Sequence, residues 1–311
     1  MNVFQKIALL TLCVVALTKL FDDELQTRRV NQLRIASSRT LDSDGNDQEE
    51  RPVMHTFYEH KEEGEDSLLE VWAIEWNRAG FDTKVLSMAD ARAHPYFEEM
   101  EKIIKPILGE LYNGLCFYRW LAMVQAGGGW MSDYDVLPTN FPIEDGLVLP
   151  NGGNFTSFQA HVPCLMSGSQ EEWSRVTHLL MDAFPRSIEK FGYPTDMRAF
   201  MILEGEQQSH NIDIDYNIYF GWPYRDMRTG FQYKEPRIID CEIMKIGRAV
   251  HLSHKDTDKA YKQGLFPVKI PRGDSPSRQH RGEAGKTLLE DWRSQCQAEI
   301  QEVKEQNLSV I

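Results

Sequence analysis

The segment from Pro106 to Ala126 constrains the fold more than any other part of the chain. Apolar residues lie on most sides of a helical wheel drawn for it, and a helix with that pattern is buried. Three glycines at 127–129 end the helix. The chain then continues through Trp130–Pro138, which we interpret as a turn into a short strand that holds Asp133 and Asp135. The sequence therefore places two carboxylates directly after a core helix.

The chain before this helix has the strand–helix–strand order with which an α/β sheet begins. Residues 52–58 have the pattern of a strand, and residues 68–79 have helical spacing with Trp72 and Trp76 on one stripe. A second strand is predicted at 83–86. We interpret both tryptophans as core residues rather than as a platform for a ligand, and we predict an α/β fold.

Five later segments have patterns that predict further elements. They are a strand at 161–166, helices at 173–184 and 196–203, a late strand at 237–246 and a terminal helix at 288–303.

The N-terminal part of the chain differs from the rest. Residues 1–21 include an apolar run at 7–16 that is short for a bilayer span, which needs about 20 apolar residues. The run has the length of a signal-peptide core, so it is either a cleaved signal or a short uncleaved signal anchor. A buried N-terminal helix is the third alternative. Residues 22–51 are polar and read as a stem or linker. Residues 52–311 remain as the catalytic domain.

The net charge narrows the class of partner. The chain has 34 Lys and Arg against 47 Asp and Glu, a formal charge of −13. Such a surface repels phosphate backbones, so we expect no binding to nucleic acid. A local acidic cluster that holds a cation remains compatible with this charge.

The number and spacing of the cysteines indicate what they could do in an oxidising or a reducing compartment. Their spacing includes no Cys-x-x-Cys pair, which argues against a zinc site. In an oxidising lumen, the four cysteines outside the apolar run would form two disulfides, for which three pairings are possible. The alternative is four buried or free thiols. These cysteines are Cys116, Cys164, Cys241 and Cys296, and the N-x-S/T sequons are at Asn154 and Asn307.

The candidate site combines Arg119, Gly128, Gly129, Asp133 and Asp135. The glycines would let the backbone approach a ligand closely, and Asp-x-Asp on an extended segment puts both carboxylates on one side. Hard oxygen ligands of this kind suit Mg²⁺ or Mn²⁺, which would bridge the pyrophosphate of a nucleotide sugar. An arginine would give the donor a fixed positive fork. A solvated turn is the alternative for an isolated Asp-x-Asp.

The stretches Tyr118–Leu121, Gly128–Trp130 and Asp133–Val136 together resemble the DXD sugar-binding region of glycosyltransferase family 32. The resemblance implies a GT-A-type nucleotide-diphospho-sugar transferase fold, with a mixed sheet flanked by helices. It also implies a UDP- or GDP-sugar donor, a manganese-type cofactor and a Golgi setting. An uncleaved anchor would then make the chain a single-pass type II membrane protein of the secretory lumen.

The resemblance also implies roles for individual residues. Asp133 would contact the ribose or sugar of the donor and, with Asp135, would hold the metal, while Arg119 would face the donor sugar or phosphate. Two positions depart from the family pattern. Cys116 stands where an acidic residue is usual, and Met131 stands where the aromatic of the turn is usual. Both departures leave the identity of the donor open.

Two further candidates come from late or acceptor-side positions of GT-A enzymes. His251 or His254 would supply a third metal ligand, with His251 favoured, and the alternative is a pair of core or surface histidines. Asp196 stands where such folds place an acceptor-side carboxylate. A helix N-cap at Thr195 or Asp196 explains that position equally well.

We therefore expect a metal-dependent, retaining hexosyltransferase that acts on a glycan or glycolipid acceptor. Front-face displacement is the implied mechanism, and a covalent intermediate would need a carboxylate nucleophile such as Asp196 or Asp215. The main alternative is a non-catalytic luminal protein that binds glycans or nucleotide sugars. A phosphatase of the haloacid dehalogenase type fits poorly, because Leu137 stands where that class has Thr or Val.

Overall fold

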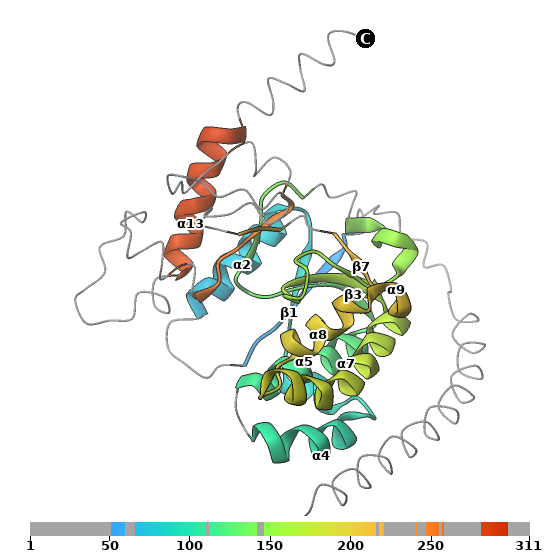
Figure 1. The fold of residues 1–311 in the computed structure, drawn as a ribbon. Helices are drawn as coiled ribbons and strands as arrows, with labels where there is room; N and C mark the ends of the chain where they lie inside the picture. The colour runs from blue at the N-terminus through green and yellow to red at the C-terminus, as the bar shows by residue number, and fades with distance from the viewer. Residues whose placement is uncertain are drawn as a thin grey trace, which may run out of the picture. The chain divides into compact units, whose positions relative to one another are not determined.

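A six-stranded mixed sheet forms the centre of the structure, a computed structural model (Figure 1). The strand order is β2-β1-β3-β6-β5-β7, with β1 parallel to β2 and β3, and β6 antiparallel to β3 and β5. Strand β7 is parallel to β5. The strands are β1 (Val53–Phe57), β2 (Asp82–Leu86), β3 (Gly128–Ser132), β5 (Thr156–Ser157), β6 (Leu165–Ser169) and β7 (Asp213–Ile214). The predicted α/β class is confirmed.

The structure describes residues 51–59, 66–109, 112–141, 146–215, 218–220, 241, 247–254, 257 and 281–297. The proposed signal segment at 1–21 and all but the last residue of the linker at 22–51 lie outside these ranges. So do Asn307 and, except for Cys241, the strand predicted at 237–246. In the described part of the chain, no helix has both the length and the apolar content that a membrane crossing requires.

Alternating side chains of the strands build one core on each face of the sheet. On β3, Trp130 packs into the core beneath helices α2 (Asp66–Arg78) and α13 (Arg281–Trp292), whereas Met131 points to the opposite core. That second core lies beneath helices on the other face. They are α4 (Phe97–Leu108), α5 (Tyr112–Ala126), α7 (Gln170–Phe191) and α8 (Asp196–Gly205). The result is a sheet flanked by helices, as predicted (Figure 1).

The helix expected at 106–126 is two helices. Helix α4 ends at Leu108, and Gly109 follows with φ +61°, a left-handed backbone that favours glycine. Helix α5 then starts at Tyr112. Pro106 lies inside the last turn of α4 instead of opening a helix. The single-helix prediction was wrong because apolar residues continue on both sides of Gly109 and hide the break.

Three other predicted boundaries also move. The strand expected at 161–166 is β6 at Leu165–Ser169, because a turn at 159–163 delays it. Helix α7 runs beyond 173–184, since Ser169 caps its start and Gly192 ends it with φ +84°. The terminal helix begins at Arg281 rather than at 288.

The remaining elements are short strands and short helical segments. A second, three-stranded sheet has the order β4-β9-β8. The elements are α3 (Met88–Arg92), β4 (Val136–Pro138), η1 (Pro150–Gly153), α9 (Gln207–His210), β8 (Ile218–Phe220), β9 (Ala249–His251) and η2 (Arg293–Gln297).

Buried tryptophans attach the helices to the strands next to the two aspartates. Trp72 donates its indole N–H to Ser132 Oγ at 2.8 Å, and Trp76 donates to the carbonyl of Val136 at 3.0 Å. Both rings are fully buried, which confirms their prediction as core residues. Because indole N–H groups need a partner when buried, these two bonds fix the strand ends on either side of residues 133–135.

The two glycines at the start of β3 have different surroundings. A Cβ on Gly128 (φ +77°) would lie 2.5 Å from the backbone nitrogen of Gln170, whereas a Cβ on Gly129 (φ +97°) would meet nothing within 4 Å. Gly128 is therefore required for close approach of the chain to itself, at the start of α7.

This difference predicts unequal costs of substitution. Gly129→Ala should lower the free energy of unfolding by about 1–2 kcal/mol, the cost of a left-handed backbone with a side chain. Gly128→Ala should cost about 3 kcal/mol or more, because collision with backbone atoms is added. Urea unfolding of the full chain measures both values, and equal losses would contradict the packing described for Gly128.

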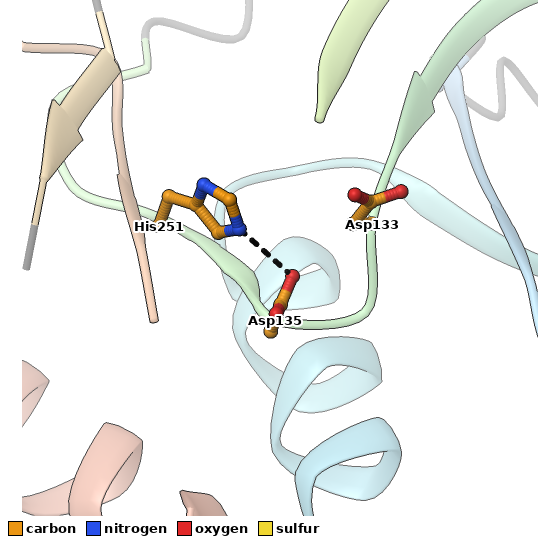
Figure 2. Close-up of side chains that lie close together, drawn as sticks. All are labelled: Asp133, Asp135 and His251. Atoms are coloured by element: carbon orange, nitrogen blue, oxygen red, sulfur yellow. Dashed lines mark ion pairs between the residues drawn. The ribbon is translucent and has the colours of Figure 1, made fainter. Parts of the chain in front are cut away.

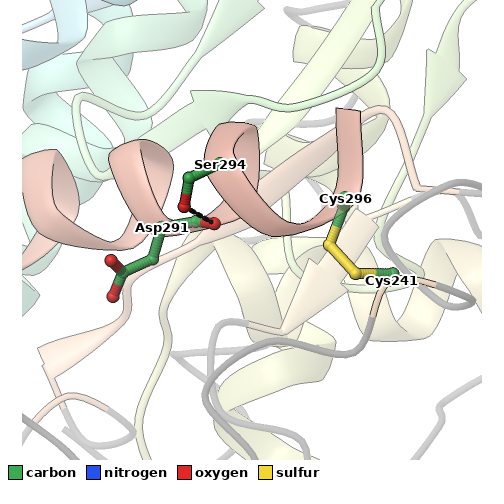
Figure 3. Close-up of a disulfide and its surroundings, with 4 residues drawn as sticks. All are labelled: Cys241, Asp291, Ser294 and Cys296. Atoms are coloured by element: carbon green, nitrogen blue, oxygen red, sulfur yellow. Dashed lines mark hydrogen bonds between the residues drawn. A yellow bond between two sulfur atoms is a disulfide. The ribbon is translucent and has the colours of Figure 1, made fainter. Parts of the chain in front are cut away.

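One disulfide joins Cys241 to Cys296, with their Cα atoms 5.2 Å apart (Figure 3). Cys116 and Cys164 are free thiols, so the expected second disulfide is not formed between them. Cys296 lies in the segment that follows α13, and Cys241 is 55 residues before it in the chain. The bond therefore ties this segment to a distant part of the sequence.

Removal of this bond should destabilise the protein. Replacing Cys241 and Cys296 by serine releases a covalently closed loop, which is expected to cost about 2–4 kcal/mol of unfolding free energy. Urea unfolding of the variant against the wild type measures the loss, and peptide mass mapping without reductant checks the pairing. Equal stability of the two proteins would mean that the bond contributes nothing to the fold.

Candidate functional site

Asp133 and Asp135 lie in the tight turn between β3 and β4 rather than on a strand. The backbone N–H of Val136 donates to the carbonyl of Asp133 at 3.0 Å and closes the turn. The turn is fixed on both sides. The backbone N–H of Asp133 donates to the backbone carbonyl of Cys164, and the backbone N–H of Leu252 donates to the carbonyl of Asp135. The expectation of alternating side chains on a strand was wrong, and turn closure brings the two carboxylates together instead.

His251 completes a group of three side chains with these aspartates (Figure 2). It is the last residue of β9, which pairs antiparallel with β4 so that His251 stands opposite Val136. One ligand atom from each of Asp133, Asp135 and His251 lies within 4.8 Å of the other two, so the group could hold a metal ion. Within the group, His251 Nε2 and Asp135 Oδ1 are 3.4 Å apart.

The group lies at the carboxyl end of two parallel strands. Residue 133 follows β3 directly, and Tyr58 follows the parallel strand β1. The rings of Tyr58 and Tyr134 are 5.2 Å apart and meet edge to face. Open α/β sheets bind ligands outside the carboxyl ends of their strands, which is where this group is found.

Arg119 stands between two carboxylates. From α5 it donates to Asp133 Oδ1 and to Asp196 Oδ2, each at 2.5 Å, and its side chain is only 10% exposed. Asp196 also accepts from the indole of Trp120 at 3.3 Å and from the backbone of Met197 at 2.7 Å. Both oxygens of Asp196 therefore have donors.

The helix cap beside Asp196 is Thr195. Its hydroxyl accepts from the backbone N–H of Arg198 at 3.0 Å, and Asp196 is the first residue of α8. Of the two residues suggested as an N-cap, Thr195 has that role, and the side chain of Asp196 is directed to Arg119 instead.

Arg281 is a neighbour of the group that the sequence did not predict. It is fully buried at the start of α13, and it donates to Asp135 Oδ2 and, at 2.7 Å, to the carbonyl of Leu252. It also contacts His254 Nε2 at 2.9 Å, which places His254 beside the arginine, outside the group of three. His251 is thus the histidine that joins the aspartates, as favoured.

Two glycines in the same helix as Arg281 are a sequence signal that this helix packs closely. A Cβ on Gly285 would lie 2.8 Å from Leu137 Cδ1, and one on Gly282 would lie 2.7 Å from Ser67 Oγ. Two glycines three residues apart, at 282 and 285, indicate a helix that packs closely on other elements.

Burial and charge set the protonation of the group. Burial raises the pKa of Asp133 to about 6, although Arg119 opposes the rise. Burial acts in the same direction on Asp135, but His251 and Arg281 outweigh it and hold its pKa well below the usual range. For His251, burial alone would lower the pKa, and the neighbouring Cys164 and Asp135 raise it instead.

The paired glycines are not beside the carboxylates. Gly128 and Gly129 begin β3, whereas Asp133 follows its end, and four steps along the extended chain put Gly129 about 13 Å from Asp133. The structure brings together Arg119, Asp133, Asp135, His251 and Asp196. Contact of these two glycines with the nucleotide-sugar donor stays a prediction.

The comparison with protein families gives a match to which no activity is attached. A family model described as a domain of unknown function (DUF8765) matches residues 35–182. The matched region includes Arg119 and both aspartates, and it ends within α7, before Asp196 and His251. No curated protein matches the chain.

The buried pair of Arg281 and Asp135 predicts a large loss of stability when it is broken. Arg281→Met leaves the carboxylate without its guanidinium and should lower the free energy of unfolding by about 3–5 kcal/mol. Urea unfolding of Arg281→Met, Asp135→Asn and the double variant forms a cycle. The double variant should lose less than the sum of the two single losses, whereas additivity within about 0.5 kcal/mol would argue against direct coupling.

Proposed function

We propose that this protein is a metal-dependent glycosyltransferase that transfers a sugar from a UDP- or GDP-sugar to a glycan or glycolipid. The observation that carries the proposal is the convergence of Asp133, Asp135 and His251 at the carboxyl end of parallel strands, next to the fixed guanidinium of Arg119. The mixed sheet flanked by helices is compatible with the GT-A-type fold that the proposal requires.

The donor set fits a hard divalent cation. Two carboxylates suit Mg²⁺ or Mn²⁺, and the additional imidazole favours Mn²⁺. The separation of 3.4 Å between His251 Nε2 and Asp135 Oδ1 is close to the edge of a coordination octahedron, about 3 Å for metal–ligand bonds of about 2.1 Å. Bound there, the ion would stabilise the charge of the departing nucleoside diphosphate.

The protein's own groups would orient the donor. Arg119 holds Asp133 through Oδ1, which would leave Oδ2 of that carboxylate to face the metal and the donor. Asp196 holds the other side of the guanidinium, so its contacts favour a positioning role over that of a nucleophile. This supports front-face displacement, with retention of configuration, over a covalent intermediate on Asp196.

The proposed location is the lumen of the Golgi or another secretory compartment. The disulfide between Cys241 and Cys296 supports an oxidising compartment, because such bonds persist there and are rare in the cytosol. Retention as a type II membrane protein by residues 1–21 is part of the same proposal.

A second candidate is a luminal protein that binds nucleotide sugars or glycans without turnover. Cys116 favours it, since burial raises the pKa of this thiol far above the usual range and a neutral group replaces the acidic residue of the related pattern. The two candidates share the metal site and differ in whether the donor is cleaved.

Donor hydrolysis tests the proposal. The full chain is incubated with a panel of UDP- and GDP-sugars, with Mn²⁺ or with EDTA, because many transferases slowly hydrolyse their donor. One donor should be hydrolysed only with Mn²⁺, and Asp135→Ala should lower the rate at least about 100-fold, because a metal ligand is lost. Release of nucleoside diphosphate is measured.

The control is Asp82→Ala, the same change at an exposed carboxylate whose partner is Arg51. It should retain the wild-type rate. Thermal stabilisation by UDP or GDP with Mn²⁺, in the absence of hydrolysis of any donor, would support the binding protein. Substantial hydrolysis by Asp135→Ala at saturating Mn²⁺ would refute the role of this aspartate.

A further inference from the structure

Each of the three candidate ligands is held by a partner through one polar atom. The partners are Arg119 for Asp133 Oδ1, Arg281 for Asp135 Oδ2, and Gln159 for His251 Nδ1. Asp135 Oδ1 and His251 Nε2 are the atoms that then face each other across 3.4 Å. The arrangement resembles a set of ligands oriented by an outer layer of hydrogen bonds.

We propose that Gln159 is a positioning residue that fixes the proton of His251 on Nδ1 and thereby makes Nε2 the metal-binding atom. The proposal rests on the metal site described under the proposed function and extends it to a residue without a ligand role of its own. Neither the Asp-x-Asp pattern nor the family match assigns a role to this glutamine.

The chemistry of the imidazole carries the argument. A neutral imidazole has one nitrogen that donates and one that accepts. The distance from His251 Nδ1 to Gln159 Oε1 is 2.9 Å, and a carbonyl oxygen only accepts, so Nδ1 carries the hydrogen. In the neutral ring, which is the form that binds a metal ion, the lone pair is then on Nε2, the nitrogen that lies 3.4 Å from Asp135 Oδ1. A metal ligand requires this tautomer, because a protonated Nε2 has no lone pair to give.

The turn that presents Gln159 is held from several sides. The amide is 4% exposed, and its Oε1 also accepts from the thiol of Cys164 at 2.6 Å. Ser157 Oγ donates to the carbonyl of Ala160 at 3.0 Å, and Ala160 has φ +46°, which is costly for a residue with a side chain. A turn kept in such a conformation fixes the direction of the amide.

The orientation of the amide decides between two tautomers. With Oε1 toward His251, Nε2 of Gln159 is buried and has no hydrogen-bond partner in the part of the chain that the structure describes. The reverse orientation would place the amide NH₂ against Nδ1 of His251 and move the imidazole proton to Nε2. That arrangement would exclude His251 from metal binding, so the two orientations have opposite outcomes.

Metal binding by the full chain tests the proposal without any sugar donor. Gln159→Met removes the acceptor at similar volume, and the dissociation constant for Mn²⁺, measured by electron paramagnetic resonance, should rise about 10–100-fold. Gln159→Glu keeps an acceptor for Nδ1–H and should bind Mn²⁺ like the wild type. His161→Ala is the control, because it removes a side chain from the same turn that pairs with Glu204.

A spectroscopic signature separates orientation from general stability. In the wild type and Gln159→Glu, pulsed resonance of bound Mn²⁺ should show coupling to a histidine nitrogen, and this coupling should be lost in Gln159→Met. Unchanged affinity and coupling in Gln159→Met, or Mn²⁺ bound to the wild type without the coupling, would overturn the role of Gln159 and leave the proposed transferase standing. Binding by Gln159→Glu as weak as by Gln159→Met would also overturn it. No Mn²⁺ binding by the wild type would overturn both proposals.

Discussion

The buried charge of Asp135 is the constraint on which much of this structure depends. A carboxylate removed from water needs a cation and hydrogen-bond donors, and Arg281 supplies both from 146 residues further along the chain. To deliver it, α13 must lie against α2 and the second sheet, which Gly282 and Gly285 allow. The disulfide at Cys296 then fixes the segment that follows the helix. The need of one acidic side chain for a partner thus ties the turn at 133–135 to helix α13.

Local residue patterns predicted the helices and strands that are determined by apolar spacing within the segment itself. Strands β1 and β2 and helix α2 were expected because apolar spacing alone specifies them, and the core role of the tryptophans followed from the same spacing. The break at Gly109 was missed because the hydrophobic pattern runs through it. The closeness of Asp133 and Asp135 was expected from alternation along a strand, whereas the structure obtains it from a turn. A short motif can therefore predict proximity correctly through the wrong geometry.

The residues that surround the site could not be predicted in the same way. Gln159 and Arg281 reach His251 and Asp135 across 92 and 146 residues, and no spacing in one sequence reports such pairs. His251 was found because a histidine ligand was expected late in the chain, and strand pairing with β4 supplied the rest. Ligand atoms leave a recognisable pattern of residue types, whereas the groups that orient them are chemically diverse and leave none.

The distance between Asp135 and Arg281 along the chain also orders events during synthesis. At about 5–20 residues per second, the ribosome needs on the order of 10–30 seconds to make the 146 residues between them. Throughout that interval Asp135 has no guanidinium, and burying it would be unfavourable, so the turn at 133–135 stays hydrated on the nascent chain. The carboxylate pair reaches its final environment only after Arg281 and helix α13 have left the ribosome. Completion of the site is therefore a late step in the folding of this chain.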